Sequence, residues 1–165
     1  MIKLAHIEAL QRVPNWNLLY VEKILELRKQ NQESRLVFDW DPSQNDGTHN
    51  CLTFASTMIQ TITGKDLYEM LSPEDCWSTP LGAMKILRAL GFNSVDQLIG
   101  SIFSEQRITY VQRGDLVMIP CIDEGGEGMN LLGVASADPP FFWCVGPEGL
   151  SKGSLNDAVK AYKVG

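Results

Sequence analysis

The hydrophobic period of the chain changes once, near residue 108. Before this point, apolar residues recur at helical spacing; after it, short runs rich in β-branched and aromatic residues alternate with Gly, Pro, Asp and Asn. Helices followed by strands favour an α+β fold, in which an antiparallel sheet packs on the helices. The sequence contains no internal repeat and no low-complexity linker, so we expect a single domain over residues 1–165.

Helix start and stop signals divide the region before residue 108. Asn50 is a candidate N-cap, and Gly64 ends the stretch that follows it in the left-handed conformation that glycine tolerates. Thr79-Pro80 combines a threonine cap with proline at the first helical position, and Ser94-Val95-Asp96-Gln97 forms a capping box. We expect a short helical turn at 65–71 and helices near 16–27, 51–63, 80–90 and 95–102.

The region after residue 108 reads as a sheet. We expect strands at 108–111, 116–121, 131–136, 141–146 and 158–164. Both faces of 141–146 are apolar, so we expect both to be covered, either by the domain's own core, which we favour, or by a partner subunit. The chain then divides into an N-terminal helical extension, a helical part and a β-sheet part: 1–35, 36–107 and 108–165.

Cys51 stands at the expected start of the second helix, after a loop rich in Asp, Asn and Gly. A helix N-terminus favours a thiolate over a thiol, through its unpaired amides and its dipole. Cys51 also shares one helical face with Ala55, Met58, Ile59 and Ile62, so its sulfur is expected to point towards the core. This placement is typical of a nucleophilic cysteine.

A cysteine nucleophile needs a base, which is usually a histidine held by a polar residue. The sequence offers His6 and His49 only. His49 lies two residues before Cys51, and side chains at that spacing do not face each other on a helix. His49 is therefore a weak candidate for a catalytic base, and His6 is a weaker one, because it could reach the site only if the N-terminal segment folds back over it. Two ordinary surface histidines are the simpler interpretation.

Other site types are disfavoured. The net charge is −6 without a Lys/Arg cluster, which argues against nucleic acid as a partner. No apolar run approaches the ~20 residues of a membrane span, and the N-terminus lacks the pattern of a signal peptide. The four cysteines are dispersed without a Cys-x-x-Cys pair, so we expect neither metal nor cofactor. Arg113-Gly114-Asp115 suggests an adhesion motif, but a turn that begins a strand explains it more simply.

A series of short motifs follows a definite order along most of the chain. They are Trp16, Phe38-Asp39-Trp40, Asn50-Cys51-Leu52, Phe54-Ala55, Thr63-Gly64, Asp66, Arg113-Gly114-Asp115-Leu116-Val117, Leu132-Gly133-Val134 and Gly149-Leu150. This order resembles an uncharacterised group of phage-encoded proteins from tail gene clusters, which are similar to NlpC-like cell-wall cysteine peptidases. The resemblance implies a papain-like α+β fold, with N-terminal helices packed on a small C-terminal antiparallel sheet.

The resemblance also implies a role for individual positions. In active NlpC-like enzymes, a Gly-Asp-Leu strand follows the cysteine's helix, and the next strand opens with His-Val-Gly. The matching stretch here is Leu131-Leu132-Gly133-Val134, so Leu131 stands where the histidine would be. The orienting polar residue would fall among the apolar residues 141–143. Cys51 matches the nucleophile, but its partners are missing.

The expected function is therefore a structural or assembly component of a phage tail tip or baseplate, built on a non-catalytic NlpC-like fold. Its partners would be other tail or baseplate proteins. It would reside in the virion, after assembly in the host cytoplasm. The alternative is an active cysteine peptidase or amidase that cleaves peptidoglycan peptides during infection. A third hypothesis is a cytosolic protein that interacts with the host.

Overall fold

The computed structural model describes residues 10–33, 36–38, 48–49, 51–65, 85, 87–121, 129–136, 140–146 and 149–165. The helices are α1 (Trp16–Gln32), α2 (Cys51–Thr63) and α5 (Val95–Ile102), with 3₁₀ turns η2 (Ile108–Tyr110) and η3 (Leu155–Asp157). The strands are β1 (Val37–Phe38), β2 (Thr48–His49), β3 (Ser104–Gln106), β4 (Leu116–Cys121), β5 (Met129–Ala135), β6 (Phe141–Gly146), β7 (Gly149–Ser154) and β8 (Lys160–Lys163).

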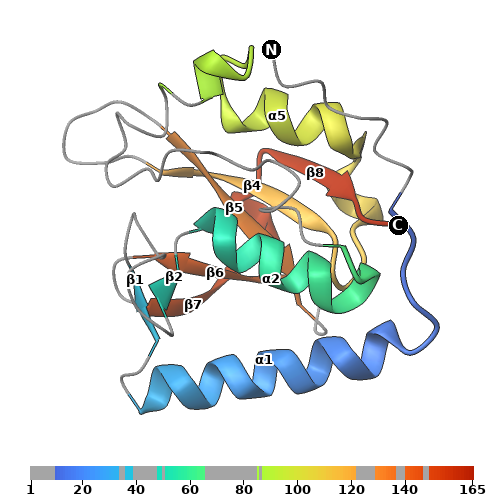
Figure 1. The fold of residues 1–165 in the computed structure, drawn as a ribbon, viewed down its shortest axis with the longest axis vertical. Helices are drawn as coiled ribbons and strands as arrows, with labels where there is room; N and C mark the ends of the chain where they lie inside the picture. Colours follow the sequence, from blue (N-terminus) through green and yellow to red (C-terminus); the bar gives the residue numbers. More distant parts are fainter. Residues whose placement is uncertain are drawn as a thin grey trace.

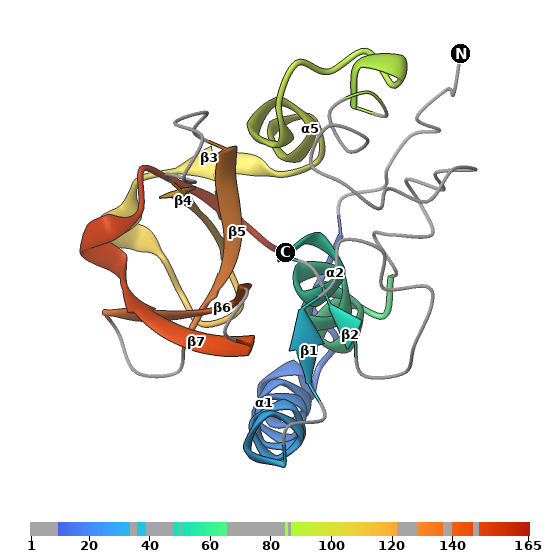
Figure 2. The same cartoon turned by 90° about the vertical axis from the view of Figure 1, so that its left-hand side faces the viewer.

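One antiparallel sheet of six strands dominates the fold, in the order β3-β8-β4-β5-β6-β7. The strand β8, close to the C-terminus, inserts between β3 and β4. The sheet is strongly curved, and α1 and α2 lie on its convex side (Figures 1 and 2). The strands β1 and β2 form a separate parallel pair, in which His49 is opposite Phe38. The α+β class, with N-terminal helices and a C-terminal antiparallel sheet, is therefore confirmed.

Alternation along the strands gives the sheet two apolar faces. Leu116 and Met118 on β4 point into the main core, whereas Val117 and Ile119 contact a second cluster on the opposite face. The main core joins the sheet to the helices; its members on α1, α2 and α5 are Tyr20, Ile24, Leu27, Leu52, Phe54, Ala55, Met58, Ile59, Ile62, Leu98 and Ile99. The second cluster is formed by Val117, Phe142, Leu155, Ala158 and Ala161, with Ile108, Val111, Ile119 and Cys144 packed against it.

Phe142 holds the second cluster together. Its side chain is 3% exposed and lies over two glycines on the neighbouring strands, Gly133 of β5 and Gly153 of β7. A Cβ at Gly133 would stand 2.9 Å from the Phe142 ring and 2.8 Å from Ile119, and a Cβ at Gly153 would collide with the same ring. The glycines therefore leave the space that the ring fills. The prediction that both faces of β6 are covered by the domain's own core is confirmed for Phe142 and Trp143, while Phe141 is 39% exposed.

Local helix signals predicted the described helices well. The helix α2 spans the predicted residues, and Gly64 follows it with φ +75°. Ser94 accepts a hydrogen bond from the Gln97 amide at 3.2 Å, as the capping box requires. Gly91, predicted to end the helix before it, has φ +91° and follows the helical residues 87–89. The predicted turn at 65–71, the Thr79-Pro80 helix start and the candidate cap Asn50 lie outside the described residues.

The strand predicted at 108–111 is wrong. These residues form the 3₁₀ turn η2, closed by hydrogen bonds from Tyr110 N to Arg107 O and from Val111 N to Ile108 O. A 3₁₀ turn places residues three apart on one side, so Ile108 and Val111 both reach the second cluster, while Tyr110 is 64% exposed. The strands β3 and β7 were not predicted, because Ser104–Gln106 is polar and Gly149–Ser154 is rich in glycine and serine.

Within the described part of the chain, no helix combines the length and apolar character that crossing a membrane requires.

Candidate functional site

The helix α2 carries the predicted nucleophile position at its start. Cys51 is its first residue, and His49, the candidate base, is the last residue of β2. The side chains of both lie outside the described part of the structure. Further along α2, Ala55, Met58 and Ile59 have no exposed surface. The helix is thus the central buried helix, and it packs against β5 and β6.

The strand β5 holds the position that the resemblance assigns to a histidine. Leu131 lies opposite Ile119 of β4, and its half-buried side chain packs against the main core. Trp143 on β6, among the positions assigned to the orienting residue, also packs against the main core. The guanidinium of Arg28 lies 5.6 Å from the Trp143 ring. Apolar side chains therefore stand at Leu131 and Trp143, where the resemblance places the histidine and the residue that orients it.

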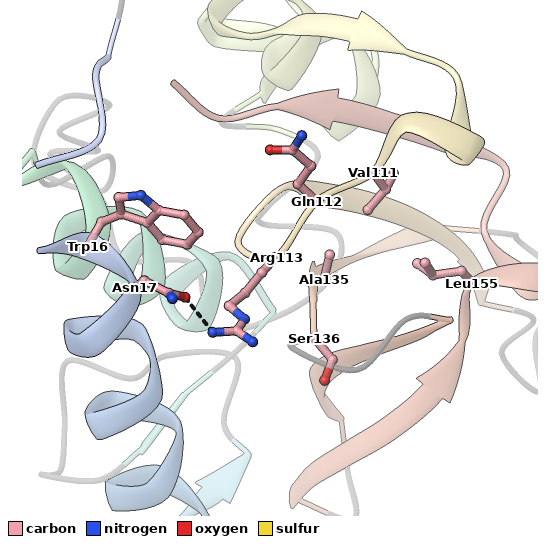
Figure 3. A pocket seen from close by; sticks show the side chains of 8 residues that line it. All are labelled: Trp16, Asn17, Val111, Gln112, Arg113, Ala135, Ser136 and Leu155. Atoms are coloured by element: carbon pink, nitrogen blue, oxygen red, sulfur yellow. Dashed lines mark hydrogen bonds between the residues drawn. The ribbon is translucent and has the colours of Figure 1, made fainter. Parts of the chain in front are cut away.

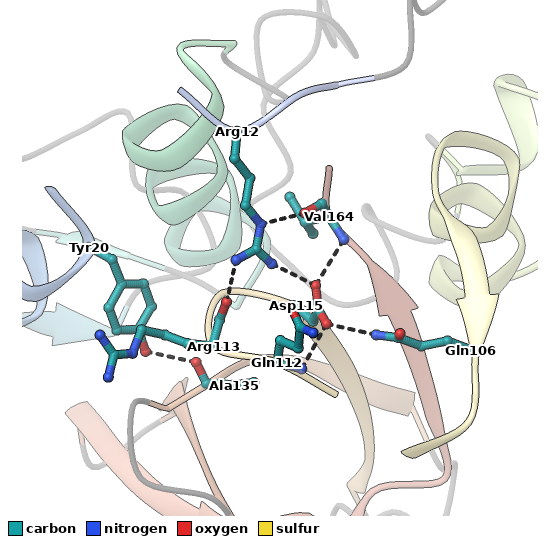
Figure 4. A network of polar contacts seen from close by, with 8 residues as sticks. All are labelled: Arg12, Tyr20, Gln106, Gln112, Arg113, Asp115, Ala135 and Val164. Carbon is teal, nitrogen blue, oxygen red and sulfur yellow. Dashed lines mark hydrogen bonds and ion pairs between the residues drawn. The ribbon is translucent and has the colours of Figure 1, made fainter. Parts of the chain in front are cut away.

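Asp115 is the centre of a buried polar network (Figure 4). Its Oδ1 accepts hydrogen bonds from Arg12 Nη2 at 2.8 Å and from Val164 N at 3.0 Å. Its Oδ2 accepts from Gln106 Nε2 at 2.8 Å and from Gln112 N at 2.9 Å. The Asp115 side chain is only 2% exposed. A carboxylate offers about four lone-pair directions, and all are used here.

Arg12 extends the network to the two ends of the described fold. Its Nε donates to Val164 O at 2.7 Å and its Nη1 to Arg113 O at 2.7 Å, while its guanidinium lies 4.2 Å from the Trp16 ring. Burial lowers the pKa of Arg12, and the charge of Asp115 and their hydrogen bond oppose this effect. The arrangement fixes the N-terminal segment against the C-terminal strand. Because its acceptors are saturated, we assign it a structural role.

The turn before β4 has the form that the sequence predicted. Gly114 has φ +87° and donates to Ala135 O at 3.0 Å, and Ala135 N donates to Asp115 O at 2.8 Å. Asp115 itself was predicted only as a turn residue. The Gly-Asp pair before a strand is the only signal for it, because the partner Arg12 is 103 residues away in the sequence.

Tyr20 links α1 to the same region. Its hydroxyl donates to Ala135 O at 2.8 Å, and its side chain is 1% exposed. Burial raises the pKa of Tyr20, and the nearby charge of Arg113 opposes the rise. The raised pKa means that the folded protein retains this proton at a pH where an unfolded chain releases it.

We therefore expect alkaline pH to destabilise the protein through Tyr20. The contribution of the neutral Tyr20 hydroxyl to stability is complete below the unfolded tyrosine pKa of about 10. It is lost progressively at higher pH, because Tyr20 then ionises in the unfolded state before it ionises in the folded state. Urea unfolding of Tyr20→Phe between about pH 8 and 11 should show a weaker decline than the wild type, after a loss of about 1 kcal/mol at neutral pH. Tyr110→Phe is the exposed control. Parallel pH profiles for Tyr20→Phe and the wild type would contradict this account.

No group of three His, Cys, Asp or Glu side chains that could hold a metal ion occurs among the residues that the structure describes. Three of the four cysteines fall outside that test in whole or in part, since Cys76 lies in a range without description and the side chains of Cys51 and Cys121 are not described. The expectation of no metal therefore stays a prediction.

Comparison with known proteins identifies a family. A family described as a domain of unknown function (DUF6950) matches residues 12–164. No curated protein and no solved structure matches the chain. The family match begins at Arg12 and ends at Val164, the two residues that a hydrogen bond joins in the buried network. Because the match covers nearly the whole chain, the protein belongs to the DUF6950 family.

Proposed function

We propose that the chain is a non-catalytic, NlpC-like domain that serves as a structural or assembly component of a phage tail tip or baseplate. The observation that carries the non-catalytic part is Leu131, which packs against the main core at the position that the resemblance gives to the catalytic histidine. The tail assignment comes from the resemblance to proteins of phage tail gene clusters.

The chemistry supports the loss of turnover. A thiol with a pKa near ~8.5 is only a few per cent thiolate at neutral pH unless a base or a positive field activates it. The neighbour of Leu131 in the strand, Leu132, is fully buried, and Ile119 lies opposite Leu131 on β4. An apolar side chain there neither accepts the thiol proton nor stabilises an imidazolium. Cys51 would then be a remnant of a nucleophile.

The outer face of α1 fits an assembly role. Leu18, Val21 and Leu25 are 60%, 36% and 55% exposed, and they follow one another on one helical face at spacings of three and four residues. Isolated exposed apolar residues are ordinary on a protein surface, but an aligned set gives a partner helix or strand a continuous contact. We assign this surface to a neighbouring tail protein.

We expect the double substitution Leu18→Lys and Leu25→Lys to lower the amount of the chain in purified phage particles by at least about tenfold, because truncating or charging a central apolar contact weakens an interface by ~2 kcal/mol or more. The isolated protein should keep its unfolding midpoint, since both side chains are exposed. Glu105→Lys, at an exposed position on β3 outside α1, makes the same change in net charge and is the matched control. Normal incorporation of the double variant would remove α1 as the interface.

The test of the tail assignment is quantitative mass spectrometry of purified virions from the phage that encodes the chain. The proposal expects the protein in the particle at a fixed copy number, and it expects Cys51→Ala particles to infect normally. Absence from virions would exclude the tail role and would favour the third hypothesis, a cytosolic protein that interacts with the host.

The alternative function is an active cysteine peptidase or amidase acting on peptidoglycan peptides. The observation that favours it is the position of Cys51 at the first residue of a 13-residue helix, where the dipole favours a thiolate. Release of peptide fragments from purified peptidoglycan by the wild type, abolished in Cys51→Ala, would establish the enzyme and overturn the non-catalytic proposal. A set of Cys51→Ala particles that assemble with unchanged composition but fail to infect would point the same way.

A further inference from the structure

An open pocket of about 370 Å³ lies beside the Gly-Asp turn (Figure 3). Trp16 and Asn17, the first two residues of α1, form one side of it. Arg113 lies on the turn, and Val111 and Leu155 line the far side. Ligand sites in proteins commonly have volumes of about 300–1,000 Å³, so the pocket has room for a small molecule or for one residue of a peptide.

The pocket lies far from Cys51. The amide of Val13 donates to the carbonyl of Ile62 at 2.9 Å, which places the start of α1 beside the C-terminal end of α2. Cys51 begins the same helix, whose 13 residues span about 18 Å. The pocket is therefore a separate site from the Cys51 position, and its ligand is independent of the proposed function.

Arg113 gives the pocket a positive charge. Among the described residues that line the pocket, Arg113 is the one with a charge, although the chain as a whole has a net charge of −6. Within the described ranges Arg113 forms no ion pair. Its Nη1 donates to Asn17 Oδ1, and its guanidinium lies 5.8 Å from the Tyr20 ring. A guanidinium has five N–H donors, and the described residues use one of them, so the geometry leaves donors for a ligand.

The buried network holds Arg113 in place before any ligand arrives. Its carbonyl accepts a hydrogen bond from Arg12 Nη1 at 2.7 Å, and the amide of the next residue, Gly114, donates a hydrogen bond to the carbonyl of Ala135. The Asn17 contact orients the guanidinium itself (Figure 3). A donor fixed in this way loses little freedom when it binds an acceptor, which strengthens binding.

The walls facing Arg113 are largely apolar. Leu155 belongs to the second cluster and Val111 packs against it, and the half-buried Trp16 ring forms the opposite wall. Arginine pairs with carboxylates through two parallel hydrogen bonds, and an apolar wall next to it favours a hydrocarbon body. We propose that this pocket binds a carboxylate attached to an apolar or aromatic group, either as a free organic acid or as the C-terminal residue of a polypeptide.

NMR titration of the full ¹⁵N-labelled chain tests the proposal, with N-acetyl-phenylalanine as the probe and its C-terminal amide as the matched control. The acid should shift the Trp16 indole N–H and the Arg113 Nε–H signals, and the amide should bind about tenfold more weakly because it lacks the charge. Absence of shifts at both groups up to about 10 mM acid, or equal affinity for acid and amide, would overturn the proposal.

Variants separate a binding role of Arg113 from a structural one. Arg113→Gln should weaken binding of the acid by about tenfold, whereas Arg107→Gln, an exposed arginine outside the pocket, should leave it unchanged. Gln112→Glu adds a negative charge to the lining at an exposed side chain and should also weaken binding of the acid. If Arg113→Gln disturbs the fold, Gln112→Glu still tests whether the pocket binds a carboxylate. Unchanged affinity in Gln112→Glu and in a folded Arg113→Gln would contradict the assignment.

A hexapeptide ending in phenylalanine with a free carboxylate distinguishes the two sources of ligand. Tighter binding of the hexapeptide than of N-acetyl-phenylalanine assigns the pocket to a polypeptide C-terminus. Equal binding of the two assigns it to a free acid.

Discussion

Asp115→Asn is expected to lower the free energy of unfolding by about 3–5 kcal/mol, since removing one member of a buried, hydrogen-bonded charge pair leaves the other uncompensated. The amide of asparagine would place two N–H donors where Asp115 now accepts from donors on both oxygens. Arg12, whose side chain is 13% exposed, would lose its counter-charge. Chemical denaturation with urea, followed by circular dichroism, measures the loss.

Asp157→Asn is the matched control for this substitution. Asp157 is exposed at the end of η3, so its replacement makes the same change in net charge without touching the network, and we expect an effect within about 0.5 kcal/mol. Arg12→Gln should lower the free energy of unfolding about as much as Asp115→Asn does. The double variant should lower it by much less than the sum of the two single effects, because the two residues act as one unit. A loss below about 1 kcal/mol for Asp115→Asn would show that the network does not hold the fold.

Phe142→Ala is expected to destabilise the protein by about 3–5 kcal/mol. The ring lies over Gly133 and Gly153, so neither neighbouring strand has a side chain that could move into the space left by the ring. The second cluster would lose its largest member, and the resulting cavity adds to the lost transfer free energy.

Phe141→Ala provides the control from the adjacent position on β6. Its side chain is 39% exposed and lies 4.7 Å from Lys152 Nζ, so we expect a loss of about 1 kcal/mol or less. Similar losses for the two variants would mean that the second cluster contributes little to stability. The comparison uses the same substitution at neighbouring residues, so effects on the unfolded chain largely cancel.

Features encoded locally could be predicted from the sequence. The helix α2 was found because a polar loop precedes it, glycine ends it and its apolar residues repeat at helical spacing. The strands β4 and β6 were found because β-branched and aromatic residues are concentrated there. The capping box of α5 depends on residues three apart and needs no tertiary information.

Features that depend on distant partners were not predicted. The strand β3 has no apolar pattern and exists because β8 pairs with it. Gly153 weakens the sequence signal for a strand at β7, yet the Phe142 ring on the adjacent strand fills the space that a side chain at Gly153 would occupy. Arg12 and Asp115 are 103 residues apart, and the pocket combines Trp16 with Arg113 and Leu155. Only folding brings these residues together, so no local signal marks them.

The account rests on the claim that the thiol of Cys51 has lost its base. The rate of alkylation by iodoacetamide between about pH 5 and 9, read at Cys51 by peptide mass mapping and normalised to the urea-unfolded chain, measures this most directly. The account predicts a rate that rises with pH around a midpoint of ~8.5 or above and is unchanged in His49→Ala. Alkylation that persists at about pH 5 and falls in His49→Ala would reveal an activated thiolate with an imidazole partner and would contradict the account.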